Sequence, residues 1–222
     1  MIEFSNVKLM YVKEFYALYN VSFKVTNGEN VALVGVLDSG KTSLLRIFAK
    51  LEKADSGEIY YNDMPISEID FSKELSVAYL SNTPILLSAS VRKNLDYVLK
   101  IRKVQKAERE TIIQKTLEEF ALTNIANERT KNLSLYQKRL LQFAMLSIRK
   151  RIDVLLVDDI LNGLNGMEYD TIKEILKTFM GKKETTTFFA TTDEGIAREL
   201  CNKLVFLKLG AVDKIENVKI KI

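Results

Sequence analysis

The chain has 222 residues, with 33 Lys and Arg against 29 Asp and Glu, one Cys and no His. This length, with 47% hydrophobic residues, is enough for a folded core and argues against disorder. The absence of imidazole excludes histidine zinc sites, Ser-His-Asp triads and Cys-His dyads within the chain. A formal charge of +4 is weak evidence for nucleic-acid binding. Cys201 has no disulfide partner and is expected to be a core thiol.

The first half of the chain predicts a sheet, a strand with its helix, and a helical stretch. Aromatic and β-branched runs in residues 1–24 predict an antiparallel sheet packed beside the main one. Residues 30–34 predict a buried strand, and a glycine-bearing turn connects it to a helix predicted over 42–53. Residues 90–152 are nearly all helical in pattern, with 107–120 as the clearest amphipathic helix.

Three more apolar segments follow this helical stretch, and helical patterns separate them. The strands are predicted at 154–157, 187–190 and 203–207, and the helices at 169–179 and 195–200. Strands that alternate with helices predict an α/β fold with a mainly parallel sheet. We therefore expect a helical subdomain, approximately residues 90–152, inserted between two core strands of one domain.

The sequence carries no feature of a membrane-spanning or exported chain. Residues 1–6 lack a basic segment followed by an apolar one, and no apolar run approaches the roughly 20 residues that span a bilayer. We expect a cytoplasmic protein whose contact with a membrane goes through a partner.

Residues 35–42, Gly-Val-Leu-Asp-Ser-Gly-Lys-Thr, fit the pattern G-x-x-x-x-G-K-[ST] between the predicted strand and helix. Glycines such as Gly35 and Gly40 let the backbone wrap a phosphate chain, and the N-terminus of the helix favours an anion. We expect Lys41 to reach the β- and γ-phosphates and the Thr42 hydroxyl to ligate Mg²⁺. The alternative is a plain glycine turn.

Asp38 is unusual because it places a carboxylate in a loop built for polyanions. Asp tolerates left-handed backbone better than most residues, so the loop is expected to keep its shape. Electrostatic repulsion predicts a weakened affinity for nucleotide.

The apolar run 154–157 ends in two acids, Asp158 and Asp159. The end of such a strand places carboxylates at the C-terminal edge of the sheet, beside a phosphate loop on a neighbouring strand. Asp158 is expected to hold Mg²⁺ through water, as a Walker B acid does. The alternative is a pair of acids that opens a solvent-exposed loop.

With these motifs in this order, the chain resembles an ATP-binding-cassette (ABC) ATPase, the nucleotide-binding subunit of an ABC transporter, over nearly its whole length, and residues 1–222 are expected to form a single nucleotide-binding domain. The supporting segments are Ser-Gly-Glu-Ile at 56–59, the Q-loop region at 78–84, the start of the helical lobe at 90–95 and the signature Leu-Ser-Leu-Tyr-Gln at 133–137. The resemblance implies that ATP and Mg²⁺ are the cofactors and that Tyr11 stacks on adenine. It also implies that Ser39, Ser43 and Ser134 contact the nucleotide, with Ser134 reaching the γ-phosphate held by the other subunit.

The departures from the family pattern fall on catalytic positions. The Q-loop glutamine, a catalytic and metal-binding position, is Asn82; the catalytic glutamate is Asp159; and the switch histidine is Thr192. Each keeps a polar group with a shorter reach, and a misplacement near 1 Å can cost on the order of 10²-fold in rate. The D-loop aspartate is Asn165, and Leu135 and Tyr136 replace the signature glycines. The resemblance therefore implies slow hydrolysis.

What the resemblance implies is a peripheral subunit at the inner face of the cell membrane. It would bind MgATP between two cassettes, in a homo- or heterodimer, and transmit closure to a transmembrane permease. The alternative is a pseudo-ATPase, a regulatory or scaffolding module whose output is closure without turnover. A nucleic-acid cassette is less favoured because the chain has neither a coiled-coil insertion nor a second cassette, so no direct contact with nucleic acid is expected.

Overall fold

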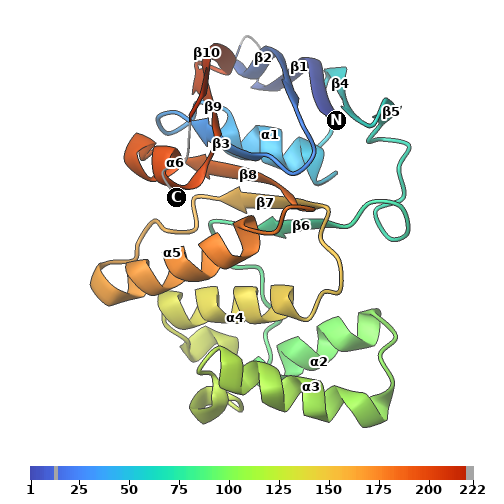
Figure 1. Cartoon of the computed structure of the whole chain (residues 1–222), viewed down its shortest axis with the longest axis vertical. Coiled ribbons are helices and arrows are strands. Elements are labelled where there is room, and N and C mark those ends of the chain that lie inside the picture. The colour runs from blue at the N-terminus through green and yellow to red at the C-terminus, as the bar shows by residue number, and fades with distance from the viewer. Residues whose placement is uncertain (13–14, 219–222) are drawn as a thin grey trace. The chain divides into compact units, whose positions relative to one another are not determined.

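The computed structural model in Figure 1 describes residues 1–12 and 15–218 and divides the chain into two compact units. One unit, called here the sheet unit, consists of Met1–Leu80, Ile152–Asp159 and Lys177–Ile222. The other, called the helical unit, consists of Ser81–Arg151 and Ile160–Leu176. The helical unit thus includes residues on both sides of the predicted 90–152 boundaries, and the organisation as one domain stays a prediction.

The larger sheet of the sheet unit has the strand order β10-β9-β3-β8-β7-β6. Neighbouring strands from β9 to β6 are parallel, and β10 is antiparallel to β9. The strands are β3 (Asn30–Val34), β6 (Val77–Leu80), β7 (Val154–Asp158), β8 (Thr186–Thr191), β9 (Lys203–Lys208) and β10 (Ala211–Asn217). The mainly parallel sheet of an α/β fold is therefore confirmed, because buried β-branched and aromatic runs fill its centre.

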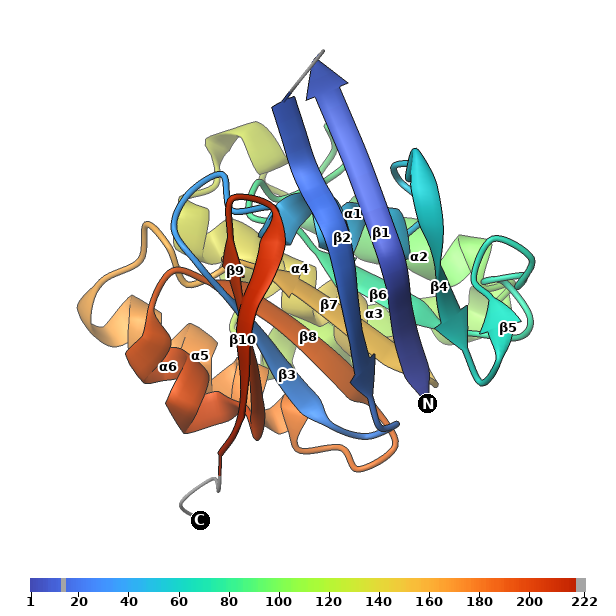
Figure 2. The same ribbon diagram turned by 90° about the horizontal axis from the view of Figure 1, so that it is seen from above.

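A second, antiparallel sheet has the order β2-β1-β4-β5, and Figure 2 shows β2, β1 and β4 side by side. Its strands are β1 (Ile2–Val12), β2 (Phe15–Val25), β4 (Ser56–Tyr61) and β5 (Met64–Pro65). This sheet confirms the antiparallel subdomain predicted from residues 1–24. Helix α1 (Lys41–Phe48) contacts both sheets.

Four phenylalanines join the two sheets and α1 into one core. Phe4 of β1 stacks on Phe23 of β2 at 4.3 Å between ring centroids, and it meets the edge of Phe188 of β8 at 5.6 Å. Phe48 of α1 lies 5.6 Å from Phe188. Offset and edge-on ring pairs of this kind add to the free energy of apolar burial, so the core fixes α1 between the sheets.

Helix α1 is shorter than the predicted 42–53. Its last helical residue is Phe48, and Lys50 has a positive φ of 56°. The backbone N–H groups of Leu51 and Glu52 both donate to the Arg46 carbonyl, which turns the chain back. Leu51, which fits the apolar spacing of the helix, lies outside it and is 55% exposed.

Three helices dominate the helical unit: α2 (Val91–Ile101), α3 (Lys106–Glu119) and α4 (Leu135–Ser147). They contact one another, and in chain order they lie between β6 and β7, as predicted. Short 3-10 turns at Thr123–Ile125 and Thr130–Asn132 connect α3 to α4. The hydroxyl of Ser90 caps α2 by accepting from the N–H of Lys93.

Two helices lie later in the chain. Helix α5 (Gly166–Met180) begins in the helical unit and ends in the sheet unit, and α6 (Glu194–Leu200) packs on β3 and β8. Cys201 follows α6 and is buried, as predicted, and its burial raises the pKa of the thiol. Among the described residues, none of the helices has both the length and the apolar character needed to cross a bilayer.

Candidate functional site

The loop 35–42 follows β3 and runs into the start of α1. Close contacts with the backbone leave no room for a side chain at two of its glycines. A Cβ atom on Gly35 would lie 2.4 Å from the carbonyl oxygen of Leu207. Gly40 has a φ of 100°, and its Cβ would lie 2.5 Å from the carbonyl oxygen of Ala17. Asp38 has a φ of 60°, so it takes up the left-handed backbone that the sequence predicted for it.

The side chain of Lys41 is folded into this loop. Its Nζ donates to the carbonyl oxygens of Gly35 and Val36, both at 2.7 Å, and to Ser39 Oγ at 3.2 Å. Burial lowers the pKa of Lys41, and the three nearby carboxylates oppose this shift, with Asp159 the largest. The loop therefore surrounds a buried cation, which is the arrangement an anionic ligand requires.

Thr42, the last residue of the loop, forms a hydrogen bond with Asp158 at the end of β7. Thr42 Oγ1 donates to Asp158 Oδ1 at 2.9 Å, and the hydroxyl of Tyr79 on β6 donates to Asp158 Oδ2 at 3.0 Å. Asp158 is 3% exposed; burial raises the pKa of its carboxyl group, and the two hydrogen bonds lower it. Burial and the neighbouring Asp158 carboxylate together raise the pKa of Tyr79.

Asp159 and Thr192 lie at the same edge of the sheet. Asp159 follows β7, has a φ of 48°, and donates its backbone N–H to the Ala190 carbonyl at 3.0 Å. Thr192 follows β8 directly and is exposed. Because β3, β7 and β8 are parallel neighbours, their C-terminal ends bring the loop, the two acids and Thr192 to one edge.

Tyr11 lies at the first turn of α1. Its hydroxyl forms a 3.0 Å hydrogen bond with Ser43 Oγ and donates to Glu52 Oε2 at 3.0 Å. The Tyr11 side chain is 52% exposed, and Ser43 is buried. The aromatic ring that the family resemblance assigns to adenine is therefore accessible, and its hydroxyl is bonded at the start of the helix that follows the loop.

An aromatic hollow of about 520 Å³ adjoins the loop. It is lined by Phe15, Tyr16, Tyr19, Asp38 and Leu209. Tyr16 and Tyr19 meet edge to face, with ring centroids 5.1 Å apart. These rings are a second set of surfaces on which a planar group could stack, and the sequence did not single them out.

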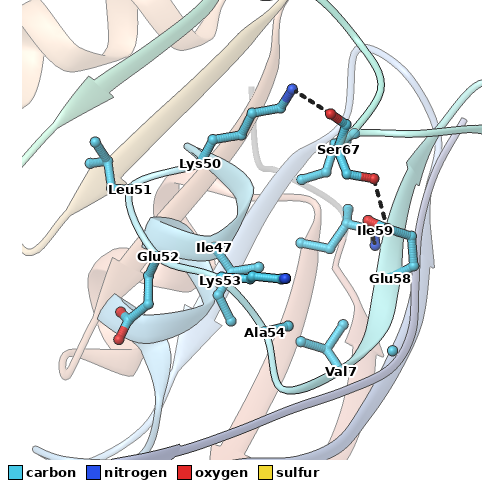
Figure 3. Close-up of a pocket in the computed structure, with 12 residues that line it drawn as sticks. Val7, Ile47, Lys50, Leu51, Glu52, Lys53, Ala54, Glu58, Ile59 and Ser67 are labelled. Carbon is cyan, nitrogen blue, oxygen red and sulfur yellow. Dashed lines mark hydrogen bonds between the residues drawn. The ribbon is translucent and has the colours of Figure 1, made fainter.

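A further cavity, of about 410 Å³, lies between the end of α1 and β4 (Figure 3). Apolar side chains, among them Ile47 and Ile59, form part of its wall. Three polar residues of its wall are hydrogen-bonded to one another: Lys50 Nζ donates to the Ser67 carbonyl, and Ser67 Oγ donates to Glu58 Oε2. None of the predicted site residues lines this cavity.

In the helical unit, Ser134 is the N-cap of α4. Ser134 Oγ accepts from the N–H of Gln137 at 3.2 Å, and Gln137 Oε1 accepts from the N–H of Ser134 at 2.9 Å. This reciprocal capping box fixes the start of the helix. Leu135 and Tyr136 form the first turn of α4.

Asn82 is held by a buried arginine of the same unit. Arg139 of α4, 1% exposed, donates to the carbonyl oxygen of Asn82 at 2.5 Å and to Asn82 Oδ1 at 3.3 Å. It also donates to the Ser81 carbonyl at 2.8 Å and to Gln142 Oε1 at 3.0 Å. The amide oxygen of Asn82, the residue that the family resemblance assigns to catalysis and the metal ion, therefore accepts a hydrogen bond from Arg139.

A family model described as ABC transporter matches residues 18–162, more than half of the chain. The chain belongs to the ABC transporter family. The sn-glycerol-3-phosphate import ATP-binding protein of Bordetella avium is 30% identical to it over 219 residues, which are 96% of this chain and 59% of that protein. The sulfate/thiosulfate import ATP-binding protein of Vibrio cholerae is 27% identical over 208 residues, 92% of this chain and 55% of that protein. The chain thus spans little more than half the length of these relatives.

Solved ABC cassettes share its fold. A dimeric cassette in a post-hydrolysis state, bound to ADP and phosphate, has a TM-score of 0.81 and 23% identity, with 99% of each chain covered. The cbiO1 protein of Clostridium perfringens, part of the transporter complex cbiONQ, has a TM-score of 0.76 and 23% identity, with 97% of this chain and 88% of that chain covered.

The site residues of this ABC chain fit the MgATP that the family implies. The Thr42 hydroxyl and the Asp158 carboxylate place two oxygen atoms within 2.9 Å of each other. Mg²⁺ is usually held by one or two carboxylates together with substrate phosphates. The glycines of the loop leave its wall free of side chains where the backbone closes around Lys41. Tyr79 lies within the segment 78–84, but the sequence predicted no role for it, and it predicted none for Glu52 or Arg139.

Proposed function

We propose that this ABC protein is the ATP-binding subunit of a transporter, with ATP and Mg²⁺ as cofactors. It would couple closure against a second cassette, in a homo- or heterodimer, to a transmembrane permease. The observation that carries the proposal is the pairing of Thr42 with Asp158 behind a glycine-constrained loop that encloses Lys41. The import functions named for the Bordetella and Vibrio relatives support a transporter.

In this proposal the loop residues bind the phosphates. Lys41 exchanges its bonds to the carbonyls of Gly35 and Val36 for the β- and γ-phosphates, and the backbone N–H groups of the loop complete the cradle. Thr42 and Asp158 hold the metal ion, which when bound neutralises charge on the phosphates. Tyr11 stacks on adenine. The remaining nucleotide contacts come from Asp38, Ser39, Gly40, Ser43 and, for the nucleotide of the other subunit, Ser134.

Hydrolysis is proposed to be slow. Asp159 would act as the base, with Thr192 and Asn82 as polar partners of the γ-phosphate and metal. Asp159 is one methylene shorter than glutamate, and a misplacement near 1 Å can cost on the order of 10²-fold in rate. Thr192 lacks the reach of imidazole, and losing one stabilising donor typically costs roughly 10²- to 10³-fold in kcat. The alternative, a pseudo-ATPase whose output is closure, is favoured by the engagement of Asn82 Oδ1 with Arg139.

The proposed location is cytoplasmic, peripheral at the inner face of the cell membrane, with membrane contact only through the permease. No direct contact with nucleic acid is proposed. Co-purification of a polytopic membrane protein from the native host would support this assignment, and co-purification of nucleic acid instead would contradict it.

Titration calorimetry with ATP tests the proposal. ATP should bind, Mg²⁺ should strengthen the binding, and Lys41→Ala should abolish it. Lys115→Ala, which removes an exposed lysine from α3, is the matched control and should bind like the parent. Failure of the parent to bind ATP, with or without Mg²⁺, would reject both the ATPase and the pseudo-ATPase.

A further inference from the structure

The Asp158 carboxylate has a second hydrogen-bond donor, Tyr79, for which the sequence predicted no role. Tyr79 donates to Oδ2 at 3.0 Å, while Thr42 donates to Oδ1 at 2.9 Å. The two hydroxyl groups come from elements far apart in the sequence, β6 and the start of α1. Each oxygen of the buried carboxylate therefore has its own donor.

Strand register explains how Tyr79 reaches this position. Tyr79 of β6 pairs with Leu156 of β7, so the two side chains lie on the same face of the sheet. Asp158 is two residues further along β7 and points to that face as well. The long phenol side chain spans this offset and places its hydroxyl at the carboxylate.

A bound metal ion would affect the hydroxyl groups of Thr42 and Tyr79 differently. Thr42 belongs to the phosphate loop and is itself a proposed metal ligand, so its hydroxyl must serve both the metal and the carboxylate. Tyr79 lies on a strand, and its ring packs against the hydrophobic core. The Tyr79 bond can hold Asp158 in one orientation whatever Thr42 does.

We propose that Tyr79 is a positioning residue for magnesium binding, because its hydroxyl fixes the carboxylate of Asp158 through Oδ2 and leaves Oδ1 to Thr42 and to the metal ion that this site would hold. The inference rests on the proposed function, since it concerns the same MgATP site. Residues that hydrogen-bond to a metal ligand and orient it typically contribute about 10- to 100-fold to metal affinity. Tyr79 supplies this orientation from a strand outside the phosphate loop and outside the acid pair.

Tyr79→Phe removes only the hydroxyl and keeps the ring in the core. The full chain is titrated with Mn²⁺ in the presence of saturating ATP, and free Mn²⁺ is followed by electron paramagnetic resonance. ATP affinity is measured separately in EDTA. We expect Tyr79→Phe to weaken Mn²⁺ binding about 10- to 100-fold and to leave the affinity for metal-free ATP at the parent value. Tyr60→Phe, on β4 of the antiparallel sheet, is the matched control and should behave like the parent.

Tyr79→Leu gives a second comparison, because it also removes the ring. It should weaken Mn²⁺ binding as much as Tyr79→Phe if the hydroxyl carries the effect. Mn²⁺ affinity unchanged in Tyr79→Phe would overturn the inference and leave the proposed function standing. An equal loss of metal-free ATP binding and Mn²⁺ binding, with a lowered melting temperature, would also overturn it, because that pattern marks a merely structural role. A parent that binds no ATP would reject the proposed function and this inference together.

Discussion

Thr42 Oγ1 and Asp158 Oδ1 lie 2.9 Å apart although 116 residues separate them in the chain. The contact joins the first turn of α1 to the last residue of β7. The two oxygen atoms meet because α1 begins, and β7 ends, at the same edge of the sheet.

Replacing Thr42 by Val removes the hydroxyl and keeps the branched shape. Mg²⁺ should then no longer strengthen ATP binding, while binding in EDTA should persist, because Lys41 and the loop backbone remain. Calorimetry with and without Mg²⁺ measures the difference. Thr42→Ser keeps the hydroxyl and should restore the Mg²⁺ effect; if it does not, the hydroxyl is not the ligand.

Asp38→Gly should strengthen ATP binding. Two unit charges about 4 Å apart interact by about 1 kcal/mol in water, which corresponds to roughly fivefold in affinity. Glycine also tolerates the φ of 60° at this position. Asp38→Asn separates the two effects, because it removes the charge and retains a residue suited to left-handed backbone. The advantage of Asp38→Asn should disappear at high salt, and an advantage of this variant that persists there would contradict repulsion as the cause.

Asp159→Glu should raise the rate of phosphate release, because it restores the methylene that the family position normally has. The gain can reach about 10²-fold if the shorter reach of Asp159 limits the rate. The left-handed backbone at this residue should make the change cost about 1 kcal/mol of unfolding free energy. Asp159→Asn is the control and should abolish release; turnover that survives it excludes Asp159 as the base.

The strand and helix alternation and the phosphate loop could be predicted from the sequence because their signals are local. Asp38 is one example, since its tolerance of left-handed backbone is a property of the residue itself. The end of α1 was predicted too late because Leu51 fits the helical spacing, whereas the turn at Lys50 depends on backbone bonds to Arg46. The hydrogen bond from Tyr79 to Asp158 could not be predicted, because it depends on the register between β6 and β7.

Tyr11→Ala should weaken ATP binding and leave binding of inorganic triphosphate unchanged. Stacking of a base on an aromatic ring is worth about 1–3 kcal/mol, and the ring of Tyr11 is accessible at the start of α1. Tyr16→Ala tests the neighbouring aromatic hollow. Calorimetry with the two ligands measures both variants. If Tyr16→Ala loses ATP affinity selectively and Tyr11→Ala does not, adenine binds in the aromatic hollow and not on Tyr11.

Arg139 connects α4 to the segment that begins the helical unit, and its replacement should destabilise that unit. The guanidinium group bonds the carbonyl oxygens of Ser81 and Asn82 from two different nitrogens. Lysine keeps the charge but cannot reproduce this fork. Arg139→Lys should leave one buried acceptor unsatisfied, which costs about 1–3 kcal/mol of unfolding free energy. Urea unfolding of the full chain measures the cost, with the exposed Arg129→Lys as matched control. Equal stability of the two variants would show that Arg139 does not hold Ser81 and Asn82 in solution.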